Sequence, residues 1–195
     1  MFPLYLNQLN EVLFRHSKSG LIGLKSEYES EGIRSSELIK LTHLAKVNGL
    51  KTALKIGGAE ARTDLISAFD QLTDYVIAPM IETAYAATKC VSMFSQLKTS
   101  AQYSPPSLLV NIETVTALEN INSIISAFNG HVDGIVFGRV DFTLSLNLPR
   151  SDIQSPYVCD SALQVSSICK ENDLEFVLGG GVSVDSIDFL KQVSN

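Results

Sequence analysis

The sequence predicts a parallel α/β fold, and specifically a (β/α) barrel. Short apolar runs alternate with helical stretches along the whole chain, with a period of about 30 residues. Charged residues follow several of the apolar runs at similar intervals, as at the mouth of a barrel. No glycine-rich dinucleotide motif or P-loop follows the first run, which disfavours an open nucleotide-binding sheet. We expect one domain over residues 1–195.

The apolar runs are rich in β-branched residues and are continuous rather than alternating, which is typical of strands buried on both faces. A closed eight-stranded barrel usually needs about 200 to 250 residues. The six strands found here therefore predict an incomplete barrel, unless residues 2–6 add a short strand. A truncated chain or completion by a partner subunit would each explain the count. The expected strands are residues 21–26, 52–58, 75–81, 107–113, 134–140 and 175–181.

The segments between these runs have the periodicity of helices that bury one face. Ser35 and Ser36 are candidate caps of a helix that ends at Asn48 and Gly49. The other expected helices are residues 1–18, 61–72, 84–97, 116–128, 161–172 and 184–193.

Composition excludes several classes of function. The chain has 15 Lys and Arg against 21 Asp and Glu, and no basic stripe, which argues against nucleic-acid binding. No apolar run approaches the roughly 20 residues that span a bilayer, so we expect no membrane partner. The three cysteines, Cys90, Cys159 and Cys169, are odd in number and lack a CxxC pattern, which favours a reducing cytoplasm.

Charged residues at the ends of the expected strands indicate where chemistry would take place. Lys25, Lys55, Glu82, Glu113 and Asp141 follow successive runs at spacings of 30, 27, 31 and 28 residues. Glu113 and Asp141 end neighbouring strands with no histidine nearby, and two such carboxylates suit Mg²⁺ or Mn²⁺. The alternative is that each carboxylate is solvated, or is paired with Lys25 or Lys55.

Two glycine-rich turns are candidate anion sites. The backbone N–H groups of Gly57 and Gly58 are placed to approach an anion, although a plain turn into the next helix is an equal alternative. Gly179 and Gly180 suit either a turn that binds phosphate or carboxylate, or a cramped turn that excludes side chains. Arg139 is a candidate contact for an anionic substrate or an adjacent subunit. Glu82 either acts in the site or pairs with a lysine.

Three stretches of the chain resemble the HpcH/HpaI aldolase and citrate lyase family of phosphoenolpyruvate/pyruvate-utilising TIM barrels. Ile112-Glu113-Thr114 matches a strand that ends in "IET". The later segments Val132-Asp133-Gly134 and Gly138 to Asp141 match "VDG" and "G..D" patterns in the same order and spacing. The resemblance spans residues 20–183, and its motifs lie in residues 78–86, 108–124 and 132–146.

The resemblance implies a metal-assisted lyase. Family members hold a divalent metal with the matching Glu and Asp, here Glu113 and Asp141. The implied reaction cleaves or forms a carbon–carbon bond through an enolate, on a small anionic 2-oxo acid or an acyl-CoA-type substrate. Lys55 stands where the family has a substrate-binding arginine, and it keeps the charge without the bidentate fork.

Other departures from the family pattern leave alternatives open. The family's acidic/His pair corresponds to residues 25–31, which contain carboxylates but no histidine, so Glu27, Glu31 or Glu82 would move the proton. The protein is therefore either such a lyase, another metal enzyme on the same scaffold, or an impaired homologue that binds metal or anions or serves in subunit assembly. Unpaired sheet edges also predict a homo-oligomer.

Overall fold

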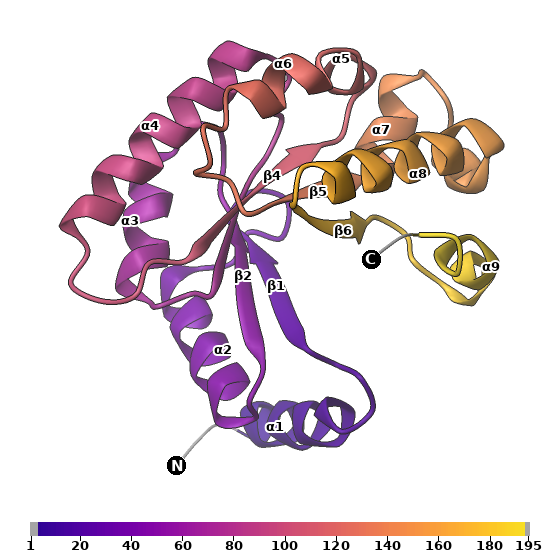
Figure 1. Ribbon diagram of the computed structural model, residues 1–195. Coiled ribbons are helices and arrows are strands. Elements are labelled where there is room, and N and C mark those ends of the chain that lie inside the picture. Colours follow the sequence, from indigo (N-terminus) through magenta and orange to yellow (C-terminus); the bar gives the residue numbers. More distant parts are fainter. Residues whose placement is uncertain (1–3, 194–195) are drawn as a thin grey trace. The chain divides into compact units, whose positions relative to one another are not determined.

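The computed structural model describes residues 4–193. Its strands form a six-stranded sheet in chain order, from β1 to β6 (Figure 1). The sequential order confirms the predicted α/β architecture, and each strand overlaps one of the six predicted runs. The strands are β1 (Gly23–Glu27), β2 (Lys51–Lys55), β3 (Tyr75–Ala78), β4 (Ser107–Ile112), β5 (Gly134–Gly138) and β6 (Glu175–Gly179).

Helices connect these strands and follow most of the predicted ranges. They are α1 (Leu4–Ser17), α2 (Ser35–Val47), α3 (Arg62–Asp70), α4 (Ala84–Ser100), α5 (Val115–Glu119), α6 (Ile121–Ser126), α7 (Arg139–Ser145), α8 (Pro156–Glu171) and α9 (Ile187–Leu190), with 3₁₀ turns η1 (Arg150–Gln154) and η2 (Val184–Ser186).

Two helix predictions and one strand alternative need correction. The single helix expected over residues 116–128 is divided at Asn120, which ends α5 and begins α6. The helix expected over residues 184–193 is a 3₁₀ turn followed by the short α9. Leu4 to Leu6 lie in α1, so they do not belong to an extra strand; residues 2 and 3 of that proposed strand lie outside the described part.

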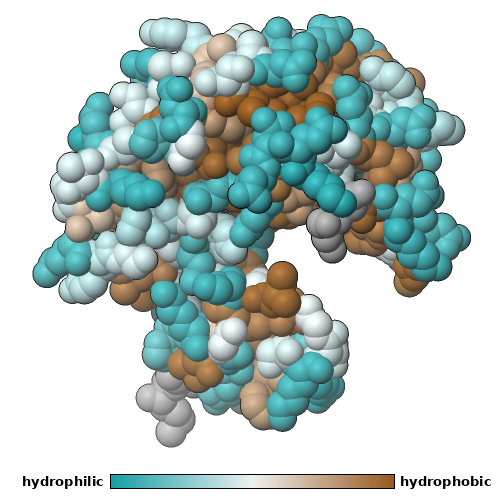
Figure 2. Space-filling view, in the orientation of Figure 1, coloured by the Kyte–Doolittle hydropathy of each residue, from teal (hydrophilic) through white to brown (hydrophobic). Residues whose placement is uncertain are grey.

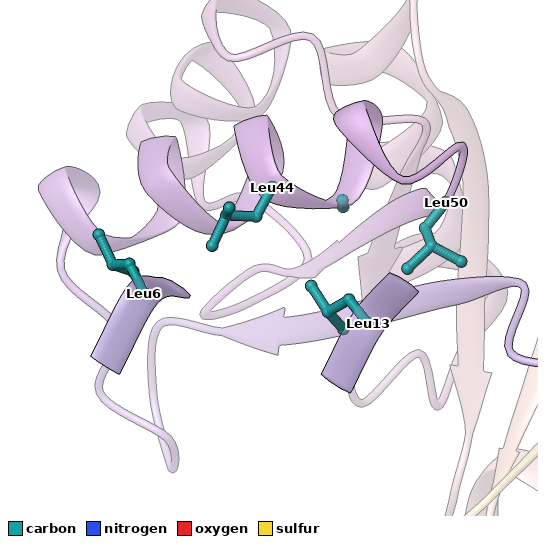
Figure 3. Packing of buried hydrophobic residues seen from close by; sticks show 5 residues of the cluster. Leu6, Leu13, Leu44 and Leu50 are labelled. Carbon is teal, nitrogen blue, oxygen red and sulfur yellow. The ribbon is translucent and has the colours of Figure 1, made fainter. Parts of the chain in front are cut away.

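The chain divides into two compact units. Unit 1 comprises Met1–Gly57, Ala61–Val76 and Ser100–Ser107. In it β1 and β2 pair in parallel, with Glu27 opposite Lys55 at the carboxyl end. Leu6 and Leu13 are seven residues apart and lie on one face of α1. They pack in a buried cluster with Leu44, Ala45 and Leu50 (Figure 3).

Unit 2 comprises Gly58–Glu60, Ile77–Thr99 and Leu108–Asn195. Its strands β4, β5 and β6 pair in parallel. Gly134 is the first residue of β5, and a side chain is excluded there because a Cβ would lie 2.6 Å from the carbonyl oxygen of Glu175. The side chains of Phe137 and Phe142 are fully buried, and their ring centroids are 4.9 Å apart. This contact fixes the start of α7 against β5.

Burial on both faces was expected for every strand, and this is wrong for β1, β2 and β6. In β1 and in β2 only two of the five residues are buried. The last five residues of β4 and the first four of β5 are buried, whereas no residue of β6 is. The reason is that β6 ends the sheet, and Val177 is 39% exposed. Figure 2 shows further hydrophobic residues among hydrophilic ones near α9, where Val184 and Ile187 are exposed.

Within the described residues, no helix combines the length and the apolar character that crossing a membrane requires.

Candidate active site

Glu113 is a buried carboxylate directly after β4. Its side chain is 2% exposed. The backbone N–H of Met80 donates to Oε1 at 3.1 Å, and the side-chain amide of Asn111 donates to Oε2 at 2.6 Å. Burying a carboxylate is costly unless donors replace its water. These two bonds therefore hold Glu113 in one orientation at the carboxyl end of β4.

Met80 supplies its N–H from an unusual backbone conformation. Its φ is 54°, in the left-handed region that side chains other than glycine seldom adopt. Such a residue typically costs about 1 to 3 kcal/mol and persists only where its surroundings impose it. Here the conformation turns the N–H toward Glu113, while the Met80 side chain is 52% exposed.

Asn111 is a functional candidate that the sequence analysis missed. It is 4% exposed, and its Oδ1 has no hydrogen-bond partner within residues 4–193. The signal was a polar residue inside an otherwise apolar strand, Ser107–Ile112. Because native structures rarely leave a buried acceptor unpaired, this oxygen is suited to a donor from a ligand or water.

Glu82 lies in the loop between β3 and α4, and its partner is a hydroxyl. Thr114 donates its hydroxyl to Oε1 of Glu82 at 2.7 Å and accepts the N–H of Ala117 as the cap of α5. The Asn120 side chain donates to the Glu82 carbonyl at 2.9 Å. Glu82 is thus joined to the residue that follows Glu113, and it is half-buried.

Asp141 lies in the first turn of α7 rather than at a strand end. The strand was expected to continue to residue 140, but β5 ends at Gly138 and α7 begins at Arg139. Ile112 pairs with Phe137 in register, so Asp141 lies three residues beyond the position opposite Glu113. The carboxylate is exposed, and a negative charge is favourable at this end of a helix.

Arg139 has no exposed surface, so its predicted contact with a substrate finds no support in its position. It donates to Oε1 of Gln154 at 3.2 Å and to the carbonyl of Gly180 at 2.8 Å. Burial lowers the pKa of the guanidinium, against the opposing effect of Cys159. Gly180 has φ of +81°, and a Cβ there would lie 2.8 Å from the N of Val140. This is the geometry of a cramped turn; Gly179 is not constrained in this way.

In unit 1, Lys25 forms ion pairs with Glu27 at 2.5 Å and with Glu31 at 3.1 Å. Lys25 lies inside β1, not at its end as predicted, because β1 continues to Glu27. Burial would lower the pKa of Lys25, but the two carboxylates outweigh burial and raise it. Glu27 is buried, and its N–H donates to Oε2 of Glu31 at 3.1 Å.

Lys55 is the last residue of β2, as predicted, and is half-buried. The turn that follows is less open to an anion than expected. The N–H of Gly57 donates to the carboxylate of Asp64 at 2.8 Å, and the Glu29 carboxylate lies against its Cα. Gly58 has open space around it. Gly57 therefore sits among negative charges.

A comparison with protein-family models shows which family the chain belongs to. Residues 40–185 match the model described as HpcH/HpaI aldolase/citrate lyase. The chain belongs to this family. The resemblance found in the "IET" and "G..D" motifs is thereby confirmed, and membership supports a function of the aldolase/citrate lyase type.

Solved structures of two HpcH/HpaI proteins and of a citrate synthase share the fold. A family protein from Burkholderia cenocepacia J2315 has a TM-score of 0.76 at 15% identity, covering 94% of this chain and 80% of that chain. An aldolase from Desulfitobacterium hafniense DCB-2 has the same score and identity, with 95% and 79% covered. Citrate synthase SbnG has a TM-score of 0.76 at 16% identity, with 94% and 78% covered. These likenesses confirm the TIM-type barrel fold. No curated protein matches the sequence.

The carboxylates of this HpcH/HpaI member suit a divalent metal that takes few protein ligands. In the described residues, no group of three or more His, Cys, Asp or Glu side chains is placed to hold a metal ion. Mg²⁺ commonly uses one or two carboxylates and fills its octahedron with water and substrate oxygens. The two Glu113 oxygens accept the bonds from Met80 and Asn111, and an ionised carboxylate offers about four lone-pair sites in all. The donor set thus fits Mg²⁺ or Mn²⁺ but no all-protein cage.

Proposed function

We propose that the protein is a divalent-metal-dependent carbon–carbon lyase that acts on a small 2-oxo acid or acyl-thioester substrate. The observation that carries this proposal is the environment of Glu113. It is buried at the end of β4, bonded by Met80 and Asn111, and stands in the "IET" motif of the family. Such bonds orient a carboxylate for metal binding, and they offset the cost of burying its charge.

Glu113 and Asp141 would hold Mg²⁺ or Mn²⁺. When bound, the metal polarises the oxo and carboxylate oxygens of the substrate and stabilises the negative charge of an enolate. The protein's own contribution is orientation: Met80 and Asn111 fix Glu113, and the start of α7 fixes Asp141.

Three residues would act on the substrate. Oδ1 of Asn111 would accept a hydrogen bond from a ligand hydroxyl or from water, since it has no partner among the residues that the structure describes. Lys55 would bind an anionic group of the substrate, from the carboxyl end of β2. Glu27 or Glu82 would move a proton, directly or through water. Gly57 and Arg139 receive no substrate contact here, because the Gly57 N–H is already bonded and Arg139 is fully buried.

Formation of an enolate can be tested directly. Deuterium from D₂O should exchange into the methyl group of pyruvate, followed by NMR, when Mg²⁺ or Mn²⁺ is added to the unaltered protein. Glu113→Gln should abolish exchange because it removes a charged metal ligand. Glu119→Gln is the matched control, since Glu119 is exposed in α5, and it should exchange at the normal rate.

The second part of the test is to measure whether the protein cleaves 4-hydroxy-2-oxo acids or acyl thioesters. Metal binding without exchange or cleavage of any such substrate would contradict the lyase and favour the impaired homologue. We also propose a homo-oligomer in the cytoplasm, a compartment that suits the three free cysteines Cys90, Cys159 and Cys169.

A further inference from the structure

We propose that Arg139 is a positioning residue that fixes the first turn of α7 and, through it, the carboxylate of Asp141. This inference rests on the proposed function, in which Asp141 is a metal ligand. It assigns to Arg139 a role inside unit 2 in place of contact with a substrate. Three features of Arg139 support this role: its partners, the backbone packing at Gly180, and the cost of its burial.

The partners of Arg139 come from three segments that follow α7 in the chain. One guanidinium nitrogen donates to Gln154 of η1, and another to the carbonyl of Gly180 after β6. The guanidinium carbon lies 5.7 Å from the centroid of the Phe189 ring in α9. Gln154 in turn donates to the Ser186 hydroxyl at 2.6 Å. One side chain therefore ties the start of α7 to η1, to the exit of β6 and to α9.

The backbone at Gly180 completes this attachment. A Cβ at Gly180 would lie 2.8 Å from the N of Val140 and 3.3 Å from the N of Arg139. Gly180 thus contacts the first turn of α7 with its Cα and the Arg139 side chain with its carbonyl oxygen. Because both contacts reach the same turn, they restrict its position from two sides.

Net stability is a poor explanation for this arginine. No carboxylate pairs with Arg139 in the described part of the chain, and its Nε has no hydrogen-bond partner. A cation also lies unfavourably at the N-terminus of a helix. A buried charge without a counter-ion is expensive, and an apolar residue of similar size is often as good for stability. What an apolar side chain lacks is the planar fork that reaches two acceptors at once.

The consequence concerns Asp141, which lies two residues after Arg139 in the same turn. The Thr143 hydroxyl donates to the Arg139 carbonyl at 2.7 Å, so the turn is also bonded from within. Asp141 is exposed, and the contacts of Arg139 determine where its turn begins. Loss of those contacts should let the carboxylate move without removing it.

Binding of Mn²⁺ to the metal-free protein, measured from the EPR signal of free Mn²⁺, tests this role without any turnover. Arg139→Gln should weaken Mn²⁺ binding about tenfold, as expected when a residue that orients a ligand is lost. Arg139→Lys should retain part of the affinity through a single bond. Val165→Ala is the control, since it removes buried atoms from α8 in the same unit; it should lower Tm and leave Mn²⁺ affinity unchanged.

Gln154→Ala provides a second variant if Arg139→Gln does not fold, because it removes one acceptor and leaves the arginine; it should weaken binding severalfold. Normal Mn²⁺ affinity in a folded Arg139→Gln protein would overturn this inference and leave the proposed function standing. If Arg139→Gln does not fold, normal Mn²⁺ affinity in Gln154→Ala would have the same meaning. Equal weakening in Val165→Ala overturns it as well, since general destabilisation would then explain the effect. If the unaltered protein does not bind Mn²⁺, the proposed function fails and the inference with it.

Discussion

The backbone of Gly138 lies against the carboxylate of Glu113. A Cβ at position 138 would be 2.7 Å from Oε2 and 2.8 Å from the Glu113 Cβ. These distances are far below van der Waals contact, so any side chain there would displace Glu113. The absence of a side chain at the end of β5 is thus a condition for the buried position of the carboxylate at the end of β4.

Gly138→Ala should therefore weaken divalent-metal binding and destabilise the protein. The added methyl group overlaps a buried side chain, and overpacking of this kind costs about 1 to 3 kcal/mol. Calorimetric titration with Mn²⁺ and urea unfolding would measure the two effects. Gly58→Ala is the matched control, because nothing lies within 4 Å of a Cβ at Gly58. Unchanged Mn²⁺ affinity in Gly138→Ala would mean that Glu113 is not a ligand or moves at no cost.

Asn111→Leu should lower both stability and metal affinity. The change keeps the side chain's size but removes the donor to Oε2 of Glu113, which leaves a buried carboxylate oxygen unpaired. Loss of a hydrogen bond to a charged group costs about 1.5 to 3 kcal/mol. Urea unfolding and Mn²⁺ calorimetry would measure it. Asn122→Leu, in α6 and exposed, serves as the control. Normal metal affinity in Asn111→Leu would contradict the orienting role of Asn111.

The fold was predictable because parallel strands leave a local signal. Continuous apolar runs such as residues 107–113 located β4 and β5, which are buried on both faces. The same pattern wrongly predicted that β6 is buried on both faces, because the exposure of a strand depends on whether it lies at the end of the sheet. The division of the 116–128 helix at Asn120 was not predicted either, because the Asn120 side chain bonds to Glu82, 38 residues away.

The candidate site was only partly predictable. Glu113 and Asp141 were found from spacing and motif, but their surroundings were not. The orientation of Glu113 depends on the backbone of Met80, whose left-handed conformation has no signature in its residue type. The burial of Arg139 depends on a carbonyl 41 residues later. Such contacts between distant positions leave no local pattern.

Lys55→Ala should weaken the binding of oxalate, a mimic of the pyruvate enolate, far more than that of Mg²⁺. The lysine would attract the anion and not the cation, and Lys55→Arg should retain part of the oxalate affinity because it keeps the charge. Calorimetry with oxalate in the presence of Mg²⁺ would show the difference. Lys51→Ala, at the other end of β2, is the control. Full oxalate affinity in Lys55→Ala would rule out the anion role.

The sheet edges predict an oligomer. β1 and β6 end the sheet, and an exposed strand edge leaves backbone groups unpaired. Exposed Val177, Val182 and Val184 add apolar surface at β6 and after it. Light scattering after size-exclusion chromatography should show a mass larger than the 21.2 kDa of one chain. Val184→Glu should reduce that mass by placing a charge on the apolar surface. A single species of monomer mass would contradict the prediction.

Asp74 should stabilise unit 1 at neutral pH and lose this effect in acid. It accepts the N–H of Thr52 at 2.8 Å and pairs with Lys51 at 3.3 Å. Burial would raise the pKa of Asp74, but the bonds from Thr52 and the charge of Lys51 outweigh burial and lower it. Its contribution is therefore present above the unfolded pKa of about 3.9 and is lost as pH falls through the lower folded value.

Asp74→Asn should cost about 1.5 to 3 kcal/mol at pH 7, the usual value of a hydrogen bond to a charged group. The difference in free energy of unfolding between the two proteins should shrink as the pH falls below about 4. Urea denaturation at pH 7 and pH 3 would measure it. Asp70→Asn makes the same charge change at the exposed end of α3 and should show no such loss. If Asp74→Asn lowers the free energy of unfolding by the same amount at both pH values, the charge of Asp74 contributes nothing to stability.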